Sequence, residues 1–136
     1  MKNKKIIIYT DGGARGNPGP AGVGAVLYNE NQEVLAKISK YLGVATNNQA
    51  EYQALILALK KAIELGAEEV NCYLDSELVV CQLNREYKVK NKDLAPLFLD
   101  IYNLSLSFKK ITFTHIPRER NKLADQLANE AMDRGA

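Results

Sequence analysis

The chain has 136 residues, and among them are no tryptophan, one histidine and two cysteines. Cys72 and Cys81 are too few for a disulfide framework and lack the spacing of a metal site, so we expect buried thiols in a reducing, cytoplasmic setting. The apolar run that follows the basic N-terminus is only three isoleucines long. This run is too short for a targeting segment or a membrane span, so we expect no membrane partner.

No single sign of charge dominates the chain, because its net charge is +2 and its pI is about 8.5. Such a balance permits a polyanionic partner but does not require one. The hydrophobic content of 46% and the charged content of 25% are typical of a soluble globular protein. Repeats, low-complexity tracts and linkers are absent, so residues 1–136 are predicted to form a single domain.

Apolar periodicity predicts an α/β fold in which strands come first and helices later. The expected strands are Lys4–Thr10, Gly22–Tyr28, Val34–Tyr41, Val70–Leu74 and Ile111–Ile116. The expected helices are Thr46–Leu65, Ser76–Leu83, Asp93–Leu106 and a last one from about Glu119 to Asp133. For the first helix, Thr46 or Asn47 is available as N-cap and Gly66 as the C-terminal stop. Together these elements predict one mixed sheet with helices on its faces.

Two aspartates follow predicted apolar strands. Asp11 lies where the first strand runs into a glycine-rich stretch, although Asp-Gly is also an ordinary hairpin-turn signal. Asp75 ends the strand Val70–Leu74, although an aspartate before a helix is also an ordinary N-cap. Because open α/β sheets build their sites at the carboxyl ends of strands, the two side chains could be neighbours.

Two further acids lie on predicted helices. Glu51 is in line with Leu55 and Ala58 on the apolar stripe, so its carboxylate faces the core and needs a partner. Asp125 lies at the edge of the apolar face of the last helix, where an exposed surface role is the simpler alternative. If the fold gathers all four acids, their mutual repulsion calls for divalent cations. Carboxylate oxygens without a histidine or cysteine set favour Mg²⁺ or Mn²⁺ over zinc, and the expected activity is metal-dependent phosphodiester hydrolysis.

Five segments in order resemble type 1 ribonucleases H over essentially the whole chain. They are Thr10-Asp11-Gly12-Gly13 with Gly16-Asn17-Pro18-Gly19-Pro20, Thr46-Asn47-Asn48-Gln49-Ala50-Glu51, Asp75-Ser76, Val89-Lys90-Asn91-Lys92-Asp93-Leu94, and Asn121-Lys122-Leu123-Ala124-Asp125 with Leu127-Ala128. The resemblance implies a ribonuclease H-like fold with a five-stranded mixed sheet in the order 3-2-1-4-5 and helices on both faces. It also implies an endoribonuclease that binds RNA–DNA hybrids as a monomer and hydrolyses their RNA strand, leaving 5′-phosphate and 3′-hydroxyl ends.

The same resemblance assigns roles to individual residues. Two Mg²⁺ ions, with Mn²⁺ as an alternative, would be held by Asp11, Glu51, Asp75 and Asp125. Substrate contacts would come from Gly12, Gly13, Asn17, Asn47, Asn48, Gln49 and Ser76. Helix capping is the alternative role for the Asn47-Asn48 pair, and we expect one of the two to do both.

The chain departs from the family pattern at two places. Only Pro117-Arg118-Glu119-Arg120 precedes Asn121, so the long loop that carries a mobile histidine in many members is missing. His115 lies within a predicted strand, and we expect Arg118 to take over the catalytic contact with phosphate or product. The segment from Asn84 to Lys90 is too short for the basic handle helix of some relatives. Lys88, Lys90 and Lys92 remain there as a smaller basic patch or as an ordinary solvated loop.

Two other classes of protein fit the sequence less well. A nucleic-acid-binding module of the same fold that no longer cuts is disfavoured because all four acids are present. Transposase and resolvase cores of the wider superfamily lack the arrangement Asn47-Asn48-Gln49-Ala50-Glu51.

Overall fold

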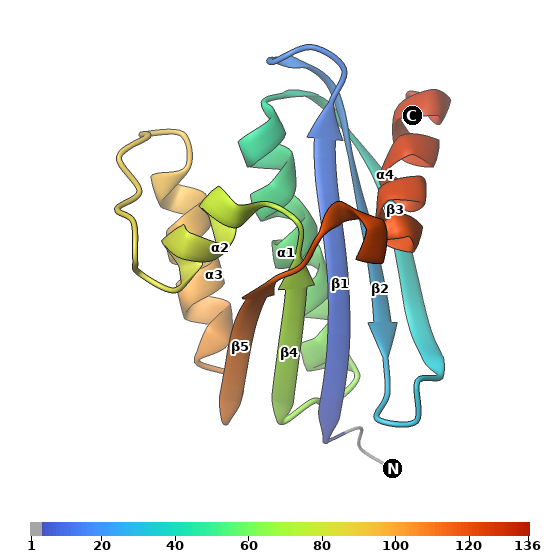
Figure 1. Ribbon diagram of the computed structural model, residues 1–136, viewed down its shortest axis with the longest axis vertical. Coiled ribbons are helices and arrows are strands. Elements are labelled where there is room, and N and C mark those ends of the chain that lie inside the picture. Colours follow the sequence, from blue (N-terminus) through green and yellow to red (C-terminus); the bar gives the residue numbers. More distant parts are fainter. Residues whose placement is uncertain (1–3) are drawn as a thin grey trace.

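The computed structural model describes residues 4–136, so the first three residues of the basic N-terminus lie outside the described part. Its centre is a five-stranded sheet in the order β3-β2-β1-β4-β5 (Figure 1). The strands are β1 (Lys5–Ala14), β2 (Gly19–Tyr28), β3 (Val34–Ala45), β4 (Glu69–Leu74) and β5 (Lys110–His115). Strands β1 to β3 pair antiparallel, whereas β4 pairs parallel with both β1 and β5. The predicted strand order and mixed sheet are confirmed.

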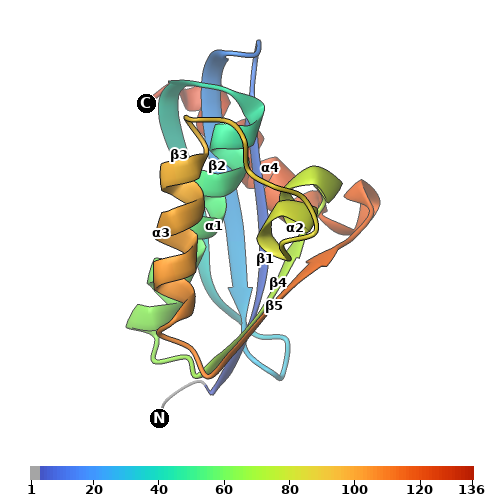
Figure 2. The ribbon, with the colours of Figure 1, turned by 90° about the vertical axis from the view of Figure 1, so that its left-hand side faces the viewer.

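Helices cover both faces of the sheet, as predicted (Figure 2). The helices α1 (Asn47–Glu64) and α3 (Ala95–Ser105) lie on one side, and α4 (Lys122–Arg134) lies on the other. The short helix α2 (Glu77–Leu83) follows β4. Strand β2 runs beneath α1 on one face and α4 on the other, and every residue from Ala21 to Leu27 is therefore buried.

The side chains of β1 alternate between the two faces of the sheet. Ile6, Ile8 and Thr10 are buried in the core beneath α1. Ile7 and Tyr9 are half-buried on the opposite face, and the alternation places Asp11 on that face as well. The strand thus delivers a carboxylate to the face on which α4 lies.

Thr46 is the N-cap of α1, which resolves the choice between Thr46 and Asn47. Its side-chain oxygen accepts the backbone N–H of Gln49 at 3.1 Å, and the Gln49 side chain accepts the backbone N–H of Thr46 at 2.8 Å. This reciprocal capping box satisfies two backbone donors that the helix itself leaves unpaired. After α1, Gly66 adopts a φ of 79°, as expected for a glycine at a helix end.

Several predicted boundaries were wrong. Strand β2 begins at Gly19 and not at Gly22, and β3 continues to Ala45 beyond the predicted end at Tyr41. Strand β1 continues to Ala14, because β2 keeps pairing with it after the parallel pairing with β4 ends at Thr10, so Asp11 lies inside a strand and not in a turn. The last helix begins at Lys122, since a 3₁₀ turn, Arg118–Arg120, precedes it and Asn121 is not helical. Helix α3 is shorter than predicted and has a proline in its first turn.

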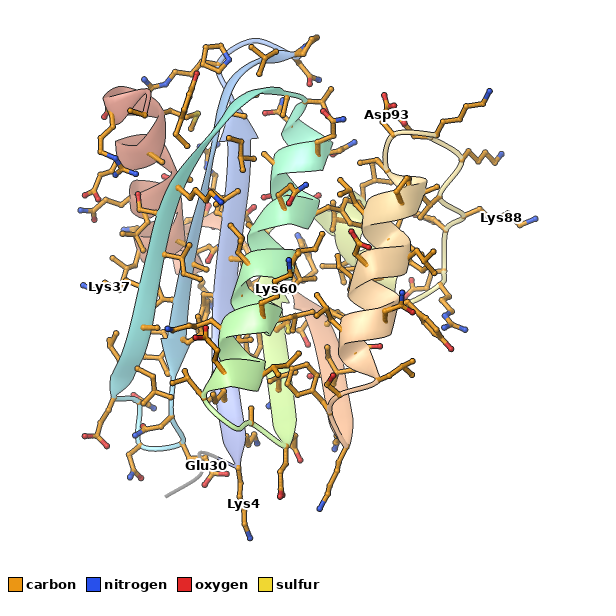
Figure 3. The ribbon with its side chains drawn as sticks, turned by 180° about the vertical axis from the view of Figure 1, so that it is seen from behind. Lys4, Glu30, Lys37, Lys60, Lys88 and Asp93 are labelled. Carbon is orange, nitrogen blue, oxygen red and sulfur yellow. The ribbon has the colours of Figure 1, made fainter. Side chains whose placement is uncertain are left out.

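Two findings concern solvent exposure. Cys72 is buried as expected, whereas Cys81 is partly exposed. The predicted basic patch lies on the extended segment between α2 and α3, where Figure 3 shows Lys88 pointing away from the body of the protein.

Within residues 4–136, none of the helices combines the length and the apolarity that crossing a bilayer would require.

Glycines in β1 and β2 allow the helices to approach the sheet closely. A Cβ atom on Gly24 would lie 2.1 Å from the carbonyl oxygen of Ala124 in α4. A Cβ atom on Gly12 would lie 2.2 Å from the carbonyl oxygen of Ala50 in α1. Both contacts are with backbone, which cannot move aside as a flexible side chain could.

Replacing Gly24 with alanine should therefore lower the free energy of unfolding by about 2–3 kcal/mol, because α4 must move off the sheet. Chemical denaturation measures this difference. Gly13→Ala is the matched control in the paired strand, because its Cβ atom would meet nothing closer than 3.8 Å. Equal stability of the two variants would show that close packing at Gly24 is not required.

Candidate active site

Four acids from four different elements gather at one pocket. Asp11 (β1), Glu51 (α1) and Asp75 (directly after β4) each offer a carboxylate oxygen within 4.8 Å of the others. Asp125, from the first turn of α4, lines the same pocket, which has a volume of about 480 Å³. The sequence-based expectation that the fold brings these side chains together is met.

The parallel pairing of β1 with β4 places the two aspartates side by side. Thr10 is paired with Leu74 at the last step of this ladder, and Asp11 and Asp75 are the next residues along each chain. Asp75 does not cap α2, because Ser76 does so by accepting the backbone N–H of Val79 at 3.3 Å. The Asp75 carboxylate is therefore free to face the pocket.

Glu51 reaches the pocket because α1 lies against β1 at Gly12. The backbone N–H of Gly12 donates to the Glu51 carboxylate at 2.5 Å, and Glu51 is only 7% exposed. This hydrogen bond and the burial hold the carboxylate in one place. The predicted core-facing charge on the apolar stripe is thus confirmed, and its partners are a backbone donor and the neighbouring acids.

Burial and electrostatic repulsion disfavour the ionised form of the carboxyl groups in this pocket. Burial, together with the nearby Asp75 and Asp125 carboxylates, raises the pKa of Asp11 to about 7. Burial also raises the pKa of Glu51 well above its usual range, and Asp11 and Asp75 add to this effect. Such a cluster is stabilised by any cation that can enter it.

Arg118 and His115, the two candidates for a catalytic contact beside the acids, lie in different places. Arg118 lines the pocket, and its guanidinium is 3.7 Å from the Asp125 carboxylate while its side chain remains 80% exposed. His115 ends β5, is exposed and does not line the pocket. Geometry therefore favours Arg118 over His115 as the residue that meets a bound phosphate.

The predicted substrate-contact residues divide into two groups. Gly12, Gly13, Asn47, Asn48 and Ser76 line the acidic pocket, whereas Asn17 and Gln49 do not. The side chain of Gln49 is used in the capping box. The Asn17 side chain accepts the backbone N–H of Asn47 at 3.0 Å.

Neither asparagine of the Asn47-Asn48 pair is the N-cap of α1, because Thr46 holds that position. Asn47 instead accepts the backbone N–H of Ala14 at 2.8 Å, which ties the start of α1 to the end of β1. We expected one of the pair to cap the helix as well as to contact substrate, and the capping half of that prediction was wrong.

Asn121 is a site residue that the sequence analysis did not assign. It is 1% exposed, and its side-chain N–H₂ group donates to the Thr10 carbonyl at 2.8 Å and to the Asp75 carboxylate at 3.2 Å. An asparagine directly before a helix is expected to cap it, yet Asn121 makes no such bond. Tertiary packing turns the Asn121 side chain toward Thr10 and Asp75, and no pattern in the neighbouring sequence predicts this orientation.

The comparisons with known proteins agree on one family. The family model described as reverse transcriptase-like matches residues 9–131. A bifunctional protein of Mycobacterium tuberculosis is 47% identical over 97% of this chain, and the chain spans only 36% of that protein's length. A ribonuclease H of Chlorobium phaeobacteroides is 34% identical, and the alignment covers 95% of this chain and 96% of the relative.

A solved structure is similar over almost the whole fold. A ribonuclease H1 isolated from compost, solved in complex with an RNA/DNA hybrid, is 48% identical. Its TM-score is 0.91, and the match covers 95% of this chain and 97% of that structure.

The raised pKa of Asp11 predicts how stability without metal depends on pH. The folded chain keeps a proton on Asp11 that the unfolded chain releases near pH 4, so the free energy of unfolding should fall as pH rises from about 4 to 7. Asp11→Asn should flatten this fall and make the metal-free protein about 1–3 kcal/mol more stable at pH 8. Denaturation in a chelator at several pH values measures both effects. Asp100→Asn, on the exposed side of α3, is the control, and an unchanged slope for Asp11→Asn would contradict the assignment.

Proposed function

Because the chain belongs to the ribonuclease H family, we propose that it hydrolyses the RNA strand of RNA–DNA hybrids and leaves 5′-phosphate and 3′-hydroxyl ends. The observation that carries this proposal is the convergence of Asp11, Glu51, Asp75 and Asp125 on one open pocket. A non-cutting binding module would have no need of four mutually repelling carboxylates. The hybrid complex of the compost enzyme supports the choice of substrate.

The residues of the pocket fit a pair of divalent cations. Within residues 4–136, no lysine or arginine forms an ion pair with Asp11, Glu51 or Asp75, so their charge is left for an external cation to balance. The donor set consists of carboxylate oxygens, which favours Mg²⁺, with Mn²⁺ as an alternative. Bound there, two such ions would supply Lewis-acid stabilisation of the charge that develops as water attacks the phosphate and the 3′ oxygen leaves.

The chain's own groups position the reactants. Asp11, Glu51, Asp75 and Asp125 would hold the ions, and the backbone N–H of Gly12 fixes the direction of the Glu51 carboxylate. Arg118 stays charged at every relevant pH, and its exposed guanidinium contacts the scissile phosphate or the departing product.

Recognition of the hybrid falls to the rim of the pocket. Asn47 and Asn48 lie at the start of α1 beside Gly12 and Gly13, where polar groups can meet 2′-hydroxyls across a wide minor groove. Lys88, Lys90 and Lys92 lie on the separate exposed segment between α2 and α3 and meet phosphates of the second strand. Action as a monomer and a cytoplasmic location remain predictions.

Asp11→Asn and Asp75→Asn should each abolish hydrolysis while the fold is preserved, because the amide keeps the shape of the side chain but removes a ligand charge. The assay compares labelled RNA–DNA hybrid, double-stranded RNA and double-stranded DNA, each with Mg²⁺, with Mn²⁺ or with chelator. We expect cleavage of the RNA strand of the hybrid, dependent on metal. Near-normal turnover of the Asp11→Asn protein at saturating Mg²⁺ would rule out the proposed ligand set.

Arg118→Ala should lower turnover by one to two orders of magnitude, on the order of 1.4–2.7 kcal/mol of barrier, because it removes the cation at the rim of the pocket. His115→Ala should leave the pH profile of turnover unchanged, since His115 does not line the pocket. Steady-state kinetics between pH 5.5 and 8.5 separates the two residues, because a limb of the profile that depends on His115 would disappear in His115→Ala, whereas an arginine stays charged throughout this range. Loss of a pH-dependent limb in His115→Ala together with a silent Arg118→Ala would reverse the assignment.

A further inference from the structure

A second pocket, of about 410 Å³, opens on the same face of the sheet as Asp11. Its floor is formed by Ile7 and Val26 of β1 and β2, and one wall is formed by Leu123 at the start of α4. The segment between β5 and α4 crosses in front of β1 (Figure 1) and carries Arg120 and Asn121, which also line this pocket. The residues that line this pocket have no part in the function proposed above, although Asn121 contacts Asp75 of the acidic pocket.

Tyrosine rings give the pocket an aromatic side. The Tyr9 ring meets the Tyr28 ring edge to face, with centroids 5.8 Å apart, and it stacks on the Tyr73 ring at 5.1 Å. Tyr9 and Tyr28 both line the pocket and are only half-buried. Burial and the neighbouring tyrosines raise the pKa of Tyr9, so its hydroxyl remains a hydrogen-bond donor.

Polar groups at the rim are free to bind a ligand. Arg120 is exposed, and within residues 4–136 its guanidinium takes part in no ion pair or hydrogen bond. It lines the same pocket as Tyr9, and its positive charge opposes the rise in the pKa of that tyrosine. Gln32, in the turn between β2 and β3, adds an exposed primary amide.

The pocket adjoins the acidic site through Asn121. This buried asparagine lines the second pocket and donates to the Asp75 carboxylate at 3.2 Å. Along β1, Tyr9 precedes Asp11 by two residues on the same face, a spacing of roughly 7 Å for an extended strand. The tyrosine-lined pocket is therefore near enough to the acids for a nucleic-acid strand with a phosphate at the acids to reach it.

We propose that this pocket binds one unpaired nucleotide of a nucleic-acid strand that extends from the catalytic pocket. The base packs between the Tyr28 ring and the apolar side chains of Ile7 and Leu123, and its hydrogen-bonding edge meets the Gln32 amide. The phosphate pairs with the Arg120 guanidinium. Aromatic rings beside an unpaired cation are the combination by which proteins hold single-stranded nucleic acid. This inference rests on the proposed function, because it takes the occupant to be part of the hybrid substrate.

The test compares a blunt hybrid with hybrids of the same duplex that carry a few unpaired nucleotides at the 5′ or the 3′ end of the RNA strand. Binding to the Asp11→Asn protein in Mg²⁺ is measured by fluorescence anisotropy of a labelled DNA strand. One of the two extended hybrids should bind about fivefold tighter or more than the blunt hybrid, since each stacked base adds affinity. Equal binding of all three hybrids, without a response to free nucleotide, would overturn the proposal.

Matched variants test whether the gain in affinity comes from this pocket. Arg120→Gln and Tyr28→Leu should each remove the gain from the extension and leave the affinity for the blunt hybrid unchanged. Tyr28→Phe, which keeps the ring, should retain most of the gain and guards against a folding defect in Tyr28→Leu. The controls are Arg85→Gln and Tyr102→Leu, which disrupt a cation–π pair elsewhere, with the guanidinium 5.3 Å from the ring centroid. Loss of the gain in these controls would place the extension elsewhere and contradict the proposal.

A free nucleotide has the same chemistry as a strand end, so a second arm separates the two sources. Uridine 5′-monophosphate is titrated into the wild-type protein while tyrosine fluorescence is followed, which is practical because the chain has seven tyrosines and no tryptophan. A response that Arg120→Gln abolishes, without any gain from strand extensions, would support the nucleotide pocket but assign it to free nucleotides. Cleavage of the blunt hybrid by the wild-type protein tests the proposed function separately, so the two failures can be distinguished.

Discussion

The contact between α1 and β1 at Gly12 is the constraint on which the acidic pocket depends. With no side chain at this position, the backbone of Ala50 and Glu51 lies directly against the strand, and the Gly12 N–H reaches the Glu51 carboxylate. Any larger residue would move the start of α1 outward and take Glu51 away from Asp11 and Asp75. The capping box at Thr46 and the hydrogen bond from the Ala14 N–H to the Asn47 side chain fix the same end of the helix, and the second bond ties it to β1.

Packing energy holds together charges that electrostatics would separate. Burial and repulsion both disfavour ionised Asp11 and Glu51, and the free energy for gathering them comes from the apolar core that packs β1 and β2 against α1. Asn121 contributes one of the few compensating hydrogen bonds within the described residues by donating to Asp75. A fold that accepts this cost gains a pocket prepared for cations before any arrive.

The sequence was a good guide wherever a local rule decides the outcome. Strand periodicity, the Thr46 cap and the Gly66 stop predicted the order of elements, and the position of Glu51 on an apolar stripe predicted a buried charge with partners. Predictions from the sequence were wrong where contacts between distant segments determine the structure. The first strand was predicted to end at Thr10 because glycines follow Asp11, but β2 pairs with it onward to Ala14. The start of α4 was misplaced because the bond from Asn121 to the Thr10 carbonyl, 111 residues away, leaves no trace in local sequence.

The connection between β5 and α4 determines more than the position of Asp125. Because it is short, it crosses the sheet as a 3₁₀ turn followed by a buried asparagine, and it separates the acidic pocket from the tyrosine-lined pocket. Arg118 lines the acidic pocket and Arg120, two residues later, lines the tyrosine-lined one. A longer loop would free these two arginines from the sheet and uncouple the pockets. The shortness of this connection thus places one cation beside each of the two adjoining pockets.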